Sequence, residues 1–358
     1  MNEYRPFPNA KQLLILTSTY GLGNPPSNAS RFEALLKQYP QDHRVQYAVL
    51  GFGSKAYVDY CAFAKKVEGL LADTSWALGY LPLYLVNDRS TDELLRWIHA
   101  YSEKALIPLA TAASAYQEKS VKMQKWRVAE KTSVSVDNST FKVVLEALSA
   151  VRYRSGDLLA IYPAKDHRER LYSIGKCSGK LQLIVKLHQP GLGSGYLHGL
   201  KVGEIIKARM MPNKAFHFPK DAPSVTMIFN GTGIAPFLGM IDENLSKIPV
   251  YLYGGFRYDN AWVATYKDFA SERMAKGRLA DFHFSFSREE PGQYVMDLIE
   301  RDSSRIANLL ENNGILMVCG SLVMLRDVEE VVDKLVQQHN GKPLAYYAER
   351  GQLLTDCY

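Results

Sequence analysis

An alternation of short apolar runs with amphipathic segments recurs at both ends of the chain, and it constrains the fold more than any other feature. In the first part, apolar runs lie at 13–16, 46–50 and 81–86. Each is followed by a segment with helical periodicity, at 28–38, 57–71 and 92–105. A strand followed by a helix, repeated, predicts a parallel sheet covered by helices. After Pro223 the alternation returns in VTMIFNG, PVYLYGG, FHFSFS and ILMVCG, which predicts a second open parallel sheet.

The sequence pattern differs between these two parts. From Trp126 to about Phe218, turn residues separate short β-rich runs, which are KTSVSV, TFKVVLEA, DLLAIYP, LQLIVKL and GEIIKAR. Such a series predicts an antiparallel barrel, and the small and polar residues of 110–123 indicate a linker before it. The expected fold class is therefore α/β plus a β-barrel. The expected domains are 1–108 and 220–358, both α/β, with a linker at 109–125 and the barrel at 126–219.

Composition excludes several classes of protein. The 358 residues are 47% hydrophobic and 22% charged, as in a globular protein, and the net charge of +6 has no clustered basic run behind it, so nucleic-acid binding is not expected. The four cysteines form no CxxC pair, so we expect reduced cysteines and a cytoplasmic location. The eight histidines form no HExxH motif, so we expect no metal. No apolar run reaches the roughly 18 residues of a membrane span, although an anchor could lie upstream.

Two glycine-containing loops in the first part are suited to a flat ligand. The loop TSTYGLGNPPSNA follows the first predicted strand, and LGFGSKAY follows the second. Glycines let the backbone approach the ligand and the tyrosines can stack on it, at the sheet edge where such ligands bind. Two ordinary glycine turns with buried tyrosines are the alternative. The candidate residues are Thr19, Tyr20, Gly21, Gly23, Gly53 and Tyr57.

The barrel contains a second candidate site, formed by RLYS and GLGSGYL. Arg170 can pair with a phosphate, Tyr172 can lie against a ring system two residues later, and Ser173 can hydrogen-bond a ring nitrogen. The second segment offers backbone N–H groups and a hydroxyl to a pyrophosphate at a helix start, at Gly191, Gly193 and Ser194. A barrel strand followed by a glycine turn is the alternative.

The last part contains the most specific motif, GTGIAPF after a strand, with Gly231, Thr232 and Gly233 placed to hold a nucleotide phosphate at a helix N-terminus. Further candidates stand at or after strand ends and at the chain terminus. They are Arg257, Ser287, Arg288, Tyr294, Cys319, Asp356 and Tyr358. A solvated Ser-Arg pair, a small buried thiol and a frayed terminus are the alternatives at these positions.

These motifs together resemble the diflavin reductases, the family of cytochrome P450 reductase and the sulfite reductase flavoprotein, within the ferredoxin–NADP reductase superfamily. The resemblance implies FMN in the two loops, FAD on the Arg-x-Tyr-Ser element and NADPH along GTGIAPF. It further implies that Ser287 and Arg288 bind the 2′-phosphate and that Tyr294 stacks on the adenine. Cys319 would lie beside the nicotinamide, with Asp356 and Ser173 as catalytic partners and Tyr358 covering the flavin.

The chain departs from the family pattern in several places. No Ser/Thr-rich FMN phosphate loop precedes the strand at 13–16, which is thereby left with an unpaired edge. Leu22, Asn24 and Ser27 stand where relatives carry carboxylates, and Gln293 replaces a lysine. Only residues 164–169 separate Pro163 from Arg170, where the diflavin family has a helical insert.

The resemblance implies an enzyme that passes hydride from NADPH to FAD and then single electrons through FMN to a protein acceptor, haem-containing or otherwise redox-active. Three alternatives remain open. The chain could be a reductase with FAD alone and a docking module without FMN, or a non-catalytic assembly subunit. It could also be a reductase linked to the cytoplasmic face of a membrane by an anchor upstream of Met1.

Overall fold

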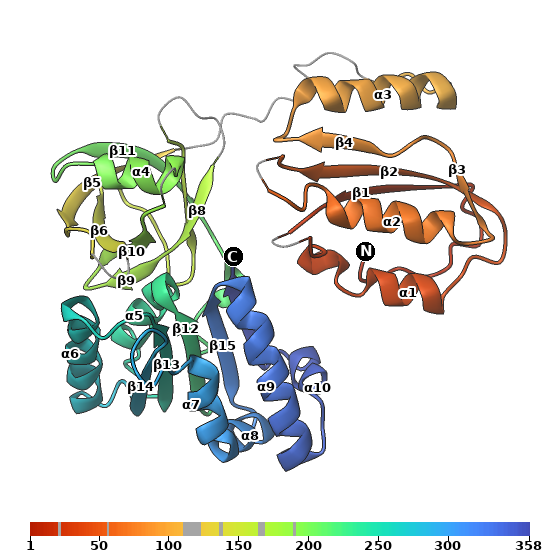
Figure 1. Cartoon of the computed structure of the whole chain (residues 1–358). Helices are drawn as coiled ribbons and strands as arrows, with labels where there is room; N and C mark the ends of the chain where they lie inside the picture. Colours follow the sequence, from red (N-terminus) through yellow and green to blue (C-terminus); the bar gives the residue numbers. More distant parts are fainter. Residues whose placement is uncertain (21–22, 56, 110–122, 136–138, 164–168, 189–190) are drawn as a thin grey trace. The chain divides into compact units, whose positions relative to one another are not determined.

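The computed structural model describes residues 1–20, 23–55, 57–109, 123–135, 139–163, 169–188 and 191–358 (Figure 1). The chain divides into two compact units, Met1–Ser120 and Val121–Tyr358. The first unit is an α/β layer structure, and the second contains a barrel-like sheet and a parallel sheet. The predicted fold class is confirmed.

The first unit is built on a parallel sheet whose central strand is β2. Its strands are β1 (Gln12–Ser18), β2 (Val45–Gly53), β3 (Ala77–Gly79) and β4 (Tyr84–Asn87). Its helices are α1 (Phe32–Gln38), α2 (Ala62–Ala72) and α3 (Thr91–Ala105), with a short 3₁₀ turn at Ser27–Ala29. Strand β2 pairs with β1 on one side and with β3 and β4 on the other. Helices α1 and α2 cover one face of this sheet and α3 covers the other (Figure 1).

Local sequence explains most of these elements, with two corrections. Helix α3 begins where Ser90 caps the backbone N–H of Glu93. The helix predicted from residue 57 instead begins at Ala62, because Cys61 before it has a left-handed backbone with φ of +51°. Thr19 Oγ1, from a distant loop, accepts the N–H of Phe63 in the first turn at 3.0 Å. The third predicted strand, at 81–86, corresponds to β4, which begins three residues later, at Tyr84. Within the described residues β1 pairs only with β2, so the predicted open edge is confirmed.

The barrel-like sheet is antiparallel, in the order β8-β7-β11-β5-β6-β10-β9. Its strands are β5 (Gln124–Lys131), β6 (Thr140–Ala147), β7 (Leu158–Ile161), β8 (Arg170–Ser173), β9 (Gly175–Cys177), β10 (Lys180–Lys186) and β11 (Ile205–Met211), and helix α4 spans Leu192–Gly199. Alternating side chains such as Trp126, Val128 and Leu145 fill its core. The strand predicted at KTSVSV lies earlier in the chain: β5 ends at Lys131, residues 132–135 are not part of it, and its Trp126 and Val128 enter the core.

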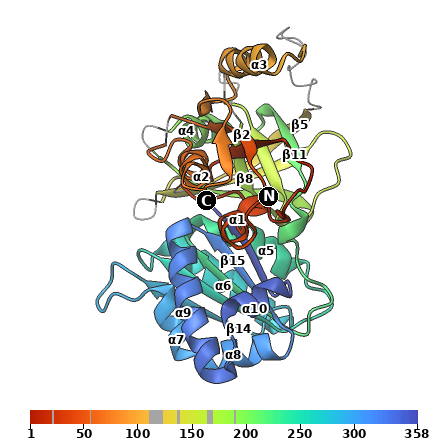
Figure 2. The same cartoon turned by 90° about the vertical axis from the view of Figure 1, so that its right-hand side faces the viewer.

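The second parallel sheet runs β14-β13-β12-β15-β16. Its strands are β12 (Val225–Asn230), β13 (Val250–Phe256), β14 (Asp281–Phe286), β15 (Ile315–Gly320) and β16 (Leu353–Cys357). Its helices are α5 (Ile234–Asp242), α6 (Ala261–Ala275), α7 (Val295–Arg301), α8 (Ser303–Glu311), α9 (Leu322–Asn340) and α10 (Leu344–Glu349). Helices α5 and α6 pack on one face, while α7 to α10 pack on the other and lie toward the viewer in Figure 2.

The barrel and this sheet share a hydrophobic core within the second unit. Ile184 of β10 and Phe216 of a 3₁₀ turn at Lys214–Phe216 belong to the cluster that contains Phe237 and Met240 of α5. Polar contacts flank this core, including an ion pair of 3.3 Å between Lys176 and Glu243. The shared core holds β8 of the barrel and the carboxyl ends of β12 and β15 in one fixed unit.

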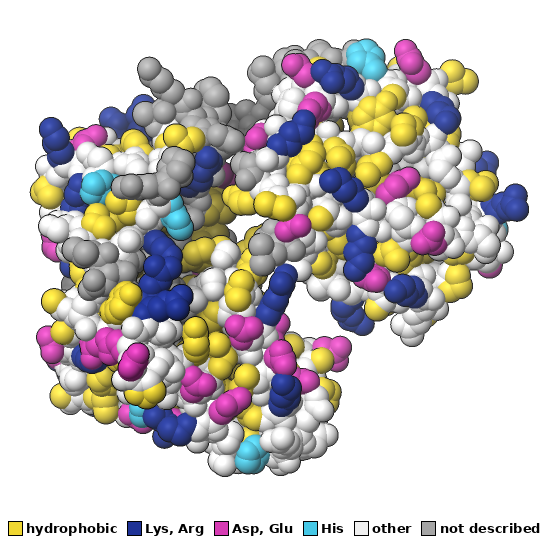
Figure 3. Space-filling view, viewed as in Figure 1, with side chains coloured by type: hydrophobic (Ala, Val, Ile, Leu, Met, Phe, Trp, Pro, Cys, Tyr) yellow, Lys and Arg dark blue, Asp and Glu magenta, His cyan; other side chains and the backbone are white. Residues whose placement is uncertain are grey.

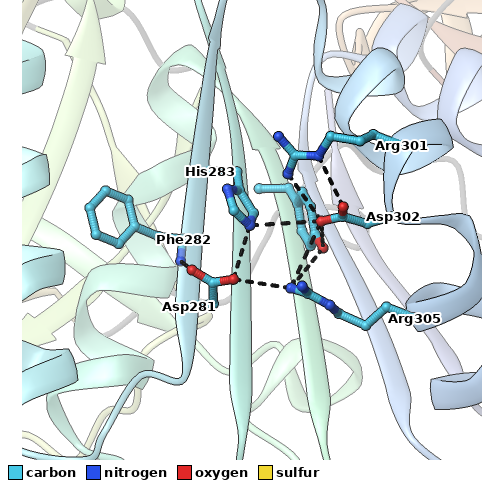
Figure 4. Close-up of polar contacts among 7 residues, drawn as sticks. Asp281, Phe282, His283, Arg301, Asp302 and Arg305 are labelled. Carbon is cyan, nitrogen blue, oxygen red and sulfur yellow. Dashed lines mark hydrogen bonds and ion pairs between the residues drawn. The ribbon is translucent and has the colours of Figure 1, made fainter.

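A polar network ties the helices α7 and α8 to the edge of the sheet (Figure 4). Asp302 accepts hydrogen bonds from Arg301 at 2.9 and 3.1 Å and from Tyr253 at 2.7 Å. Asp281 joins the network through its Oδ2, which lies 3.2 Å from Arg305 Nη1 and 3.0 Å from His283 Nε2. Hydrogen bonding to Arg301 is the main reason that the pKa of Asp302 falls to about 2 from its usual 3.8.

This network predicts the pH dependence of stability. A carboxyl whose pKa is lowered in the folded state stabilises it above the unfolded pKa, and this contribution is lost as the pH falls from about 4 to 2. Asp302→Asn should lower the unfolding free energy at pH 7 by about 1–2 kcal/mol, allowing for the half-exposed Arg301. Denaturant unfolding at several pH values measures this difference, which should shrink toward pH 2. The exposed Lys334→Gln is the matched control, and equal stability of Asp302→Asn and wild type at pH 7 would exclude the effect.

Candidate functional site

In the first unit, the loops after β1, β2 and β4 meet at the carboxyl edge of the sheet. The carbonyl of Gly53 accepts the N–H of Asp88 at 2.8 Å, and Asn87 accepts the N–H of Lys55 at 2.8 Å. Tyr20 and Tyr57, predicted to stack on a flavin, are 49% and 69% exposed. They are therefore not the buried core tyrosines of the alternative interpretation.

The other candidates in these loops shape the backbone. Gly23 has a φ of +82°, which favours glycine, and the Thr19 hydroxyl caps α2 as described. Gly21 lies outside the described residues. These features fit a planar ring at the sheet edge.

In the second unit, the RLYS strand and the GLGSGYL segment lie against each other. A Cβ at Gly193 would stand 2.7 Å from Tyr172 Oη and 2.8 Å from Arg170 Cγ, so only glycine permits the start of α4 to approach β8 this closely. Gly191 is the N-cap of α4 and has no side chain to occupy the helix N–H groups. An arginine and free N–H groups side by side fit a pyrophosphate, as predicted for FAD.

Two side chains of this region have further partners. Ser194 is buried, and its hydroxyl accepts the N–H of His188 at 3.1 Å, so it closes the loop and retains its proton to donate. Burial raises the pKa of Tyr172 to about 12, against the opposing effect of Arg170, so this residue is a neutral aromatic surface on the strand.

The GTGIAPF motif forms a 3₁₀ turn, Gly231–Gly233, followed by α5. Gly231 has a φ of +51°, and a Cβ at Gly233 would stand 2.1 Å from the carbonyl oxygen of Cys319. Asn230 accepts the N–H of Ser321 at 2.9 Å and donates to its hydroxyl at 3.0 Å. The ends of β12 and β15 are thus joined beneath the turn Gly231–Gly233, which we call the phosphate loop after its predicted role.

A pocket of about 490 Å³ extends from this loop over the sheet edge. Thr232, Arg257, Ser287, Tyr294 and Tyr358, all predicted site residues, line it. Arg288 does not, but its backbone N–H donates to the carbonyl of Arg257 at 2.9 Å, so the two arginines stand at adjacent strand ends. The predicted nucleotide residues thus come together in one pocket.

The barrel contributes residues to the same pocket that the sequence alone did not reveal. Thr140, Lys186 and His188 line it opposite Arg257. Burial lowers the pKa of Lys186, and the neighbouring Arg257 lowers it further. A lysine in an ordinary barrel strand carries no local signal of this placement, since only the fold brings β10 to the nucleotide pocket.

The four predicted catalytic residues converge where β8 meets β15 and β16. The hydroxyl of Ser173 donates to Asp356 Oδ2 at 2.6 Å. Cys319 lies opposite Asp356 in the ladder of β15 and β16, and the N–H of Tyr358 donates to the carbonyl of Gly320 at 2.9 Å. The hydroxyls of Tyr358 and Thr232 lie 3.0 Å apart, which places the terminal ring at the phosphate loop.

Burial controls the charges of this cluster. It raises the pKa of Asp356, and the hydrogen bond from Ser173 opposes that effect. Complete burial also raises the pKa of the Cys319 thiol well above its usual range, with Asp356 adding to the rise, so the thiol is neutral. Asn213, which sequence analysis missed, reaches Asp356 Oδ1 with its amide nitrogen at 3.5 Å.

Other kinds of site were sought in the described part of the chain. No group of three or more His, Cys, Asp or Glu side chains there is arranged to hold a metal ion. None of the helices described has the length and apolar character needed to cross a bilayer.

Comparison with known protein families assigns each part of the chain to a domain. Residues 1–95 match the flavodoxin family, 125–217 the oxidoreductase FAD-binding domain, and 227–330 the oxidoreductase NAD-binding domain. The order of these three domains along the chain is the order in which the loops, the barrel motifs and GTGIAPF occur.

Several curated proteins are similar to part of this chain. The chain is 28% identical over 214 residues to methionine synthase reductase of Bos taurus, covering 51% of the chain and 30% of the relative. It is 31% identical over 163 residues to a bifunctional cytochrome P450/NADPH–P450 reductase of Bacillus subtilis, covering 42% and 15%. It is 30% identical over 147 residues to NADPH-dependent diflavin oxidoreductase 1 of Saccharomyces cerevisiae, covering 40% and 23%. In these three alignments the matched segment spans less than a third of each relative's length.

The burial of the site cysteines predicts low thiol reactivity. Burial raises the pKa values of all four cysteines, to about 12 for Cys177 and Cys357, and the thiolate is the reactive form. A thiol reagent at pH 8 should therefore modify the native chain slowly and modify all four thiols in denaturant. Mass spectrometry of the alkylated peptides measures this, and rapid labelling of Cys319 in the native chain would contradict its burial.

Proposed function

We propose that this chain, which belongs to the diflavin reductase family, transfers hydride from NADPH to FAD in its second unit and passes the electrons on to a protein acceptor. The hydrogen bond of 2.6 Å between Ser173 and Asp356 is the observation that carries the proposal. It joins β8, a strand of the region that matches the FAD-binding domain, to β16, the edge strand of the second parallel sheet. The turn Gly231–Gly233 lies beside this contact. Such a junction is where a flavin ring and a nicotinamide ring could stack.

The residues that would hold FAD are those of β8 and the start of α4. Arg170 and the N–H groups after Gly191 would bind the pyrophosphate, and Tyr172 would lie against the ring system. Bound FAD would supply the hydride acceptor and could then return electrons one at a time, which is chemistry that belongs to the cofactor.

The residues that would hold NADPH line the pocket above the second sheet. The turn Gly231–Gly233 and the start of α5 would bind the pyrophosphate. Ser287 and Arg288 would bind the 2′-phosphate, with Arg257 and Lys186 adding positive charge. The exposed Tyr294 would stack on the adenine.

The catalytic cluster would position the nicotinamide and stabilise the positive charge that develops on it. Asp356 is the one carboxylate among the four predicted catalytic residues, and Ser173 orients it. Cys319 lies buried beneath as a neutral thiol. Tyr358 lines the pocket beside Thr232 and would move away when the nicotinamide binds.

The first unit would then receive the electrons through FMN, with Tyr20 and Tyr57 as stacking rings. Its surface mixes Lys and Arg with Asp and Glu on the face shown in Figure 3, so no single-charge rim there selects a partner. The acceptor would be a haem or other redox protein. That the four cysteines are thiols and form no disulfide supports a reducing, cytoplasmic location.

Two alternative functions differ from this one in the cofactors that the chain would bind. A reductase with FAD alone would use the first unit as a docking module. A non-catalytic assembly subunit would bind neither flavin nor NADPH.

Flavin content separates these candidates. The full chain, purified and incubated with FAD and FMN, should retain one FAD and one FMN per chain and reduce an artificial dye with NADPH. Chromatography of the released flavins identifies which of them are bound. FAD alone would select the single-flavin enzyme, whereas colourless protein without NADPH-driven dye reduction would contradict the proposal.

Nucleotide preference tests the phosphate residues. Arg288→Leu should raise KM for NADPH about tenfold to a hundredfold, since a charge-assisted bond to phosphate contributes about 1.5–3 kcal/mol. KM for NADH should change little, because NADH lacks the 2′-phosphate. Steady-state dye reduction with each nucleotide measures this, with Lys334→Gln as the neutral control, and a parallel rise of both KM values would refute the assignment.

A further inference from the structure

We propose that Asp157, Asn213 and His217 form a positioning unit that holds the catalytic carboxylate of Asp356 in place. Asn213 acts on Asp356 directly, whereas Asp157 and His217 act through Asn213 and through the backbone. The inference rests on the proposed function. Asp356 has two side-chain hydrogen-bond donors in the described part of the chain, Ser173 on Oδ2 and Asn213 on Oδ1. Asp157 fixes the position of both donors.

Asp157 is a buried carboxylate with three donors around it. Its side chain is 6% exposed. Oδ1 accepts the backbone N–H of Asn213 at 2.9 Å and lies 2.7 Å from His217 Nε2, while Oδ2 accepts the N–H of Arg154 at 2.9 Å. A carboxylate bonded in this way anchors both ends of the turn from Asn213 to His217.

That turn packs on the segment that contains Asp157. Gly156 has a φ of +92°, and a Cβ there would stand 2.0 Å from the carbonyl oxygen of Phe216. Phe216 itself is fully buried in the core shared by the barrel and the second sheet. The backbone of the turn, and with it Asn213, therefore has little freedom to move away from Asp356.

Asp157 also fixes the second donor through the backbone. Its carbonyl accepts the N–H of Ile174, and the next residue, Leu158, lies opposite Ser173 in the ladder of β7 and β8. One short segment thus sets the position of Ser173 on one side and of Asn213 on the other. A shift of this segment would disturb both hydrogen bonds to Asp356.

The surroundings of Asp356 make these two donors important. The titratable groups that sense its charge are Cys319, Cys357 and Tyr358, and burial raises the pKa of each. They are neutral near pH 7, so the hydrogen bond from Ser173 is what favours the ionised form of Asp356 against its burial. The amide nitrogen of Asn213, 3.5 Å from Oδ1, is placed to act in the same direction. The ionised form is the one that can stabilise a developing positive charge.

The first test measures the carboxylate without any cofactor. In the cofactor-free full chain, ¹³C NMR of labelled Asp carboxyls, assigned with Asp356→Asn, gives the titration of Asp356. Asn213→Ala should move this titration to higher pH, because it removes a donor to the ionised form. Asn213→Asp should move it further, because it places a like charge beside the carboxylate. An unchanged titration in both variants would overturn the role of Asn213.

The second test measures hydride transfer in the FAD-loaded chain. His217→Ala and Asp157→Asn should slow flavin reduction at saturating NADPH about threefold to tenfold, the equivalent of one weakened hydrogen bond. KM for NADPH should stay within about twofold, and NADPH deuterated at the transferred position should show a larger isotope effect. His217→Gln, which keeps a donor at a similar reach, should recover most of the rate.

Glu146→Gln is the matched control. It breaks an exposed ion pair of the barrel, with Lys180 at 2.8 Å, in a strand that contains none of Asp157, Asn213 and His217. The positioning unit is refuted if this control slows flavin reduction as much as His217→Ala does. It is also refuted if folded, FAD-loaded His217→Ala keeps the wild-type reduction rate and the wild-type titration of Asp356. Failure of the wild-type chain itself to oxidise NADPH would instead refute the proposed function, and the NMR titration would still decide the positioning.

Discussion

The short hydrogen bond from Ser173 to Asp356 is the contact on which the second unit's site depends. Its two residues are 183 positions apart, one in barrel strand β8 and one in β16, the last strand of the second sheet. The bond can form only when the barrel strand β8 and the last strand β16 are both in place. Folding of the barrel, addition of β16 to the sheet and assembly of the catalytic cluster are therefore coupled.

The shared hydrophobic core makes that coupling possible. Side chains of β10 and of the turn at Lys214–Phe216 pack with those of α5, so the barrel cannot move relative to the phosphate loop without opening a buried cluster. Close approaches at Gly193 and Gly233 bring backbone groups near the places where pyrophosphates would bind. The scaffold thus sets the site before any cofactor arrives, which is the preorganisation that charge stabilisation requires.

Sequence reasoning succeeded where chemistry and local structure coincide. GTGIAPF directly follows a strand and combines a tight turn with a helix start in seven consecutive residues, and the structure places it as such. Reasoning failed where a partner comes from far along the chain. The start of α2 was misplaced, and the Thr19 hydroxyl that caps it lies in another loop. Asn213 and Lys186 were missed because nothing near them in sequence shows that the fold brings them to Asp356 and to the nucleotide pocket.

Rapid mixing of the FAD-loaded full chain with NADPH in the absence of oxygen tests the central claim most directly. The account predicts that flavin absorbance near about 450 nm falls in a single fast phase, and that Asp356→Asn slows this phase without loss of FAD. A chain that binds FAD stoichiometrically and binds NADPH, yet leaves the flavin oxidised, would contradict the account.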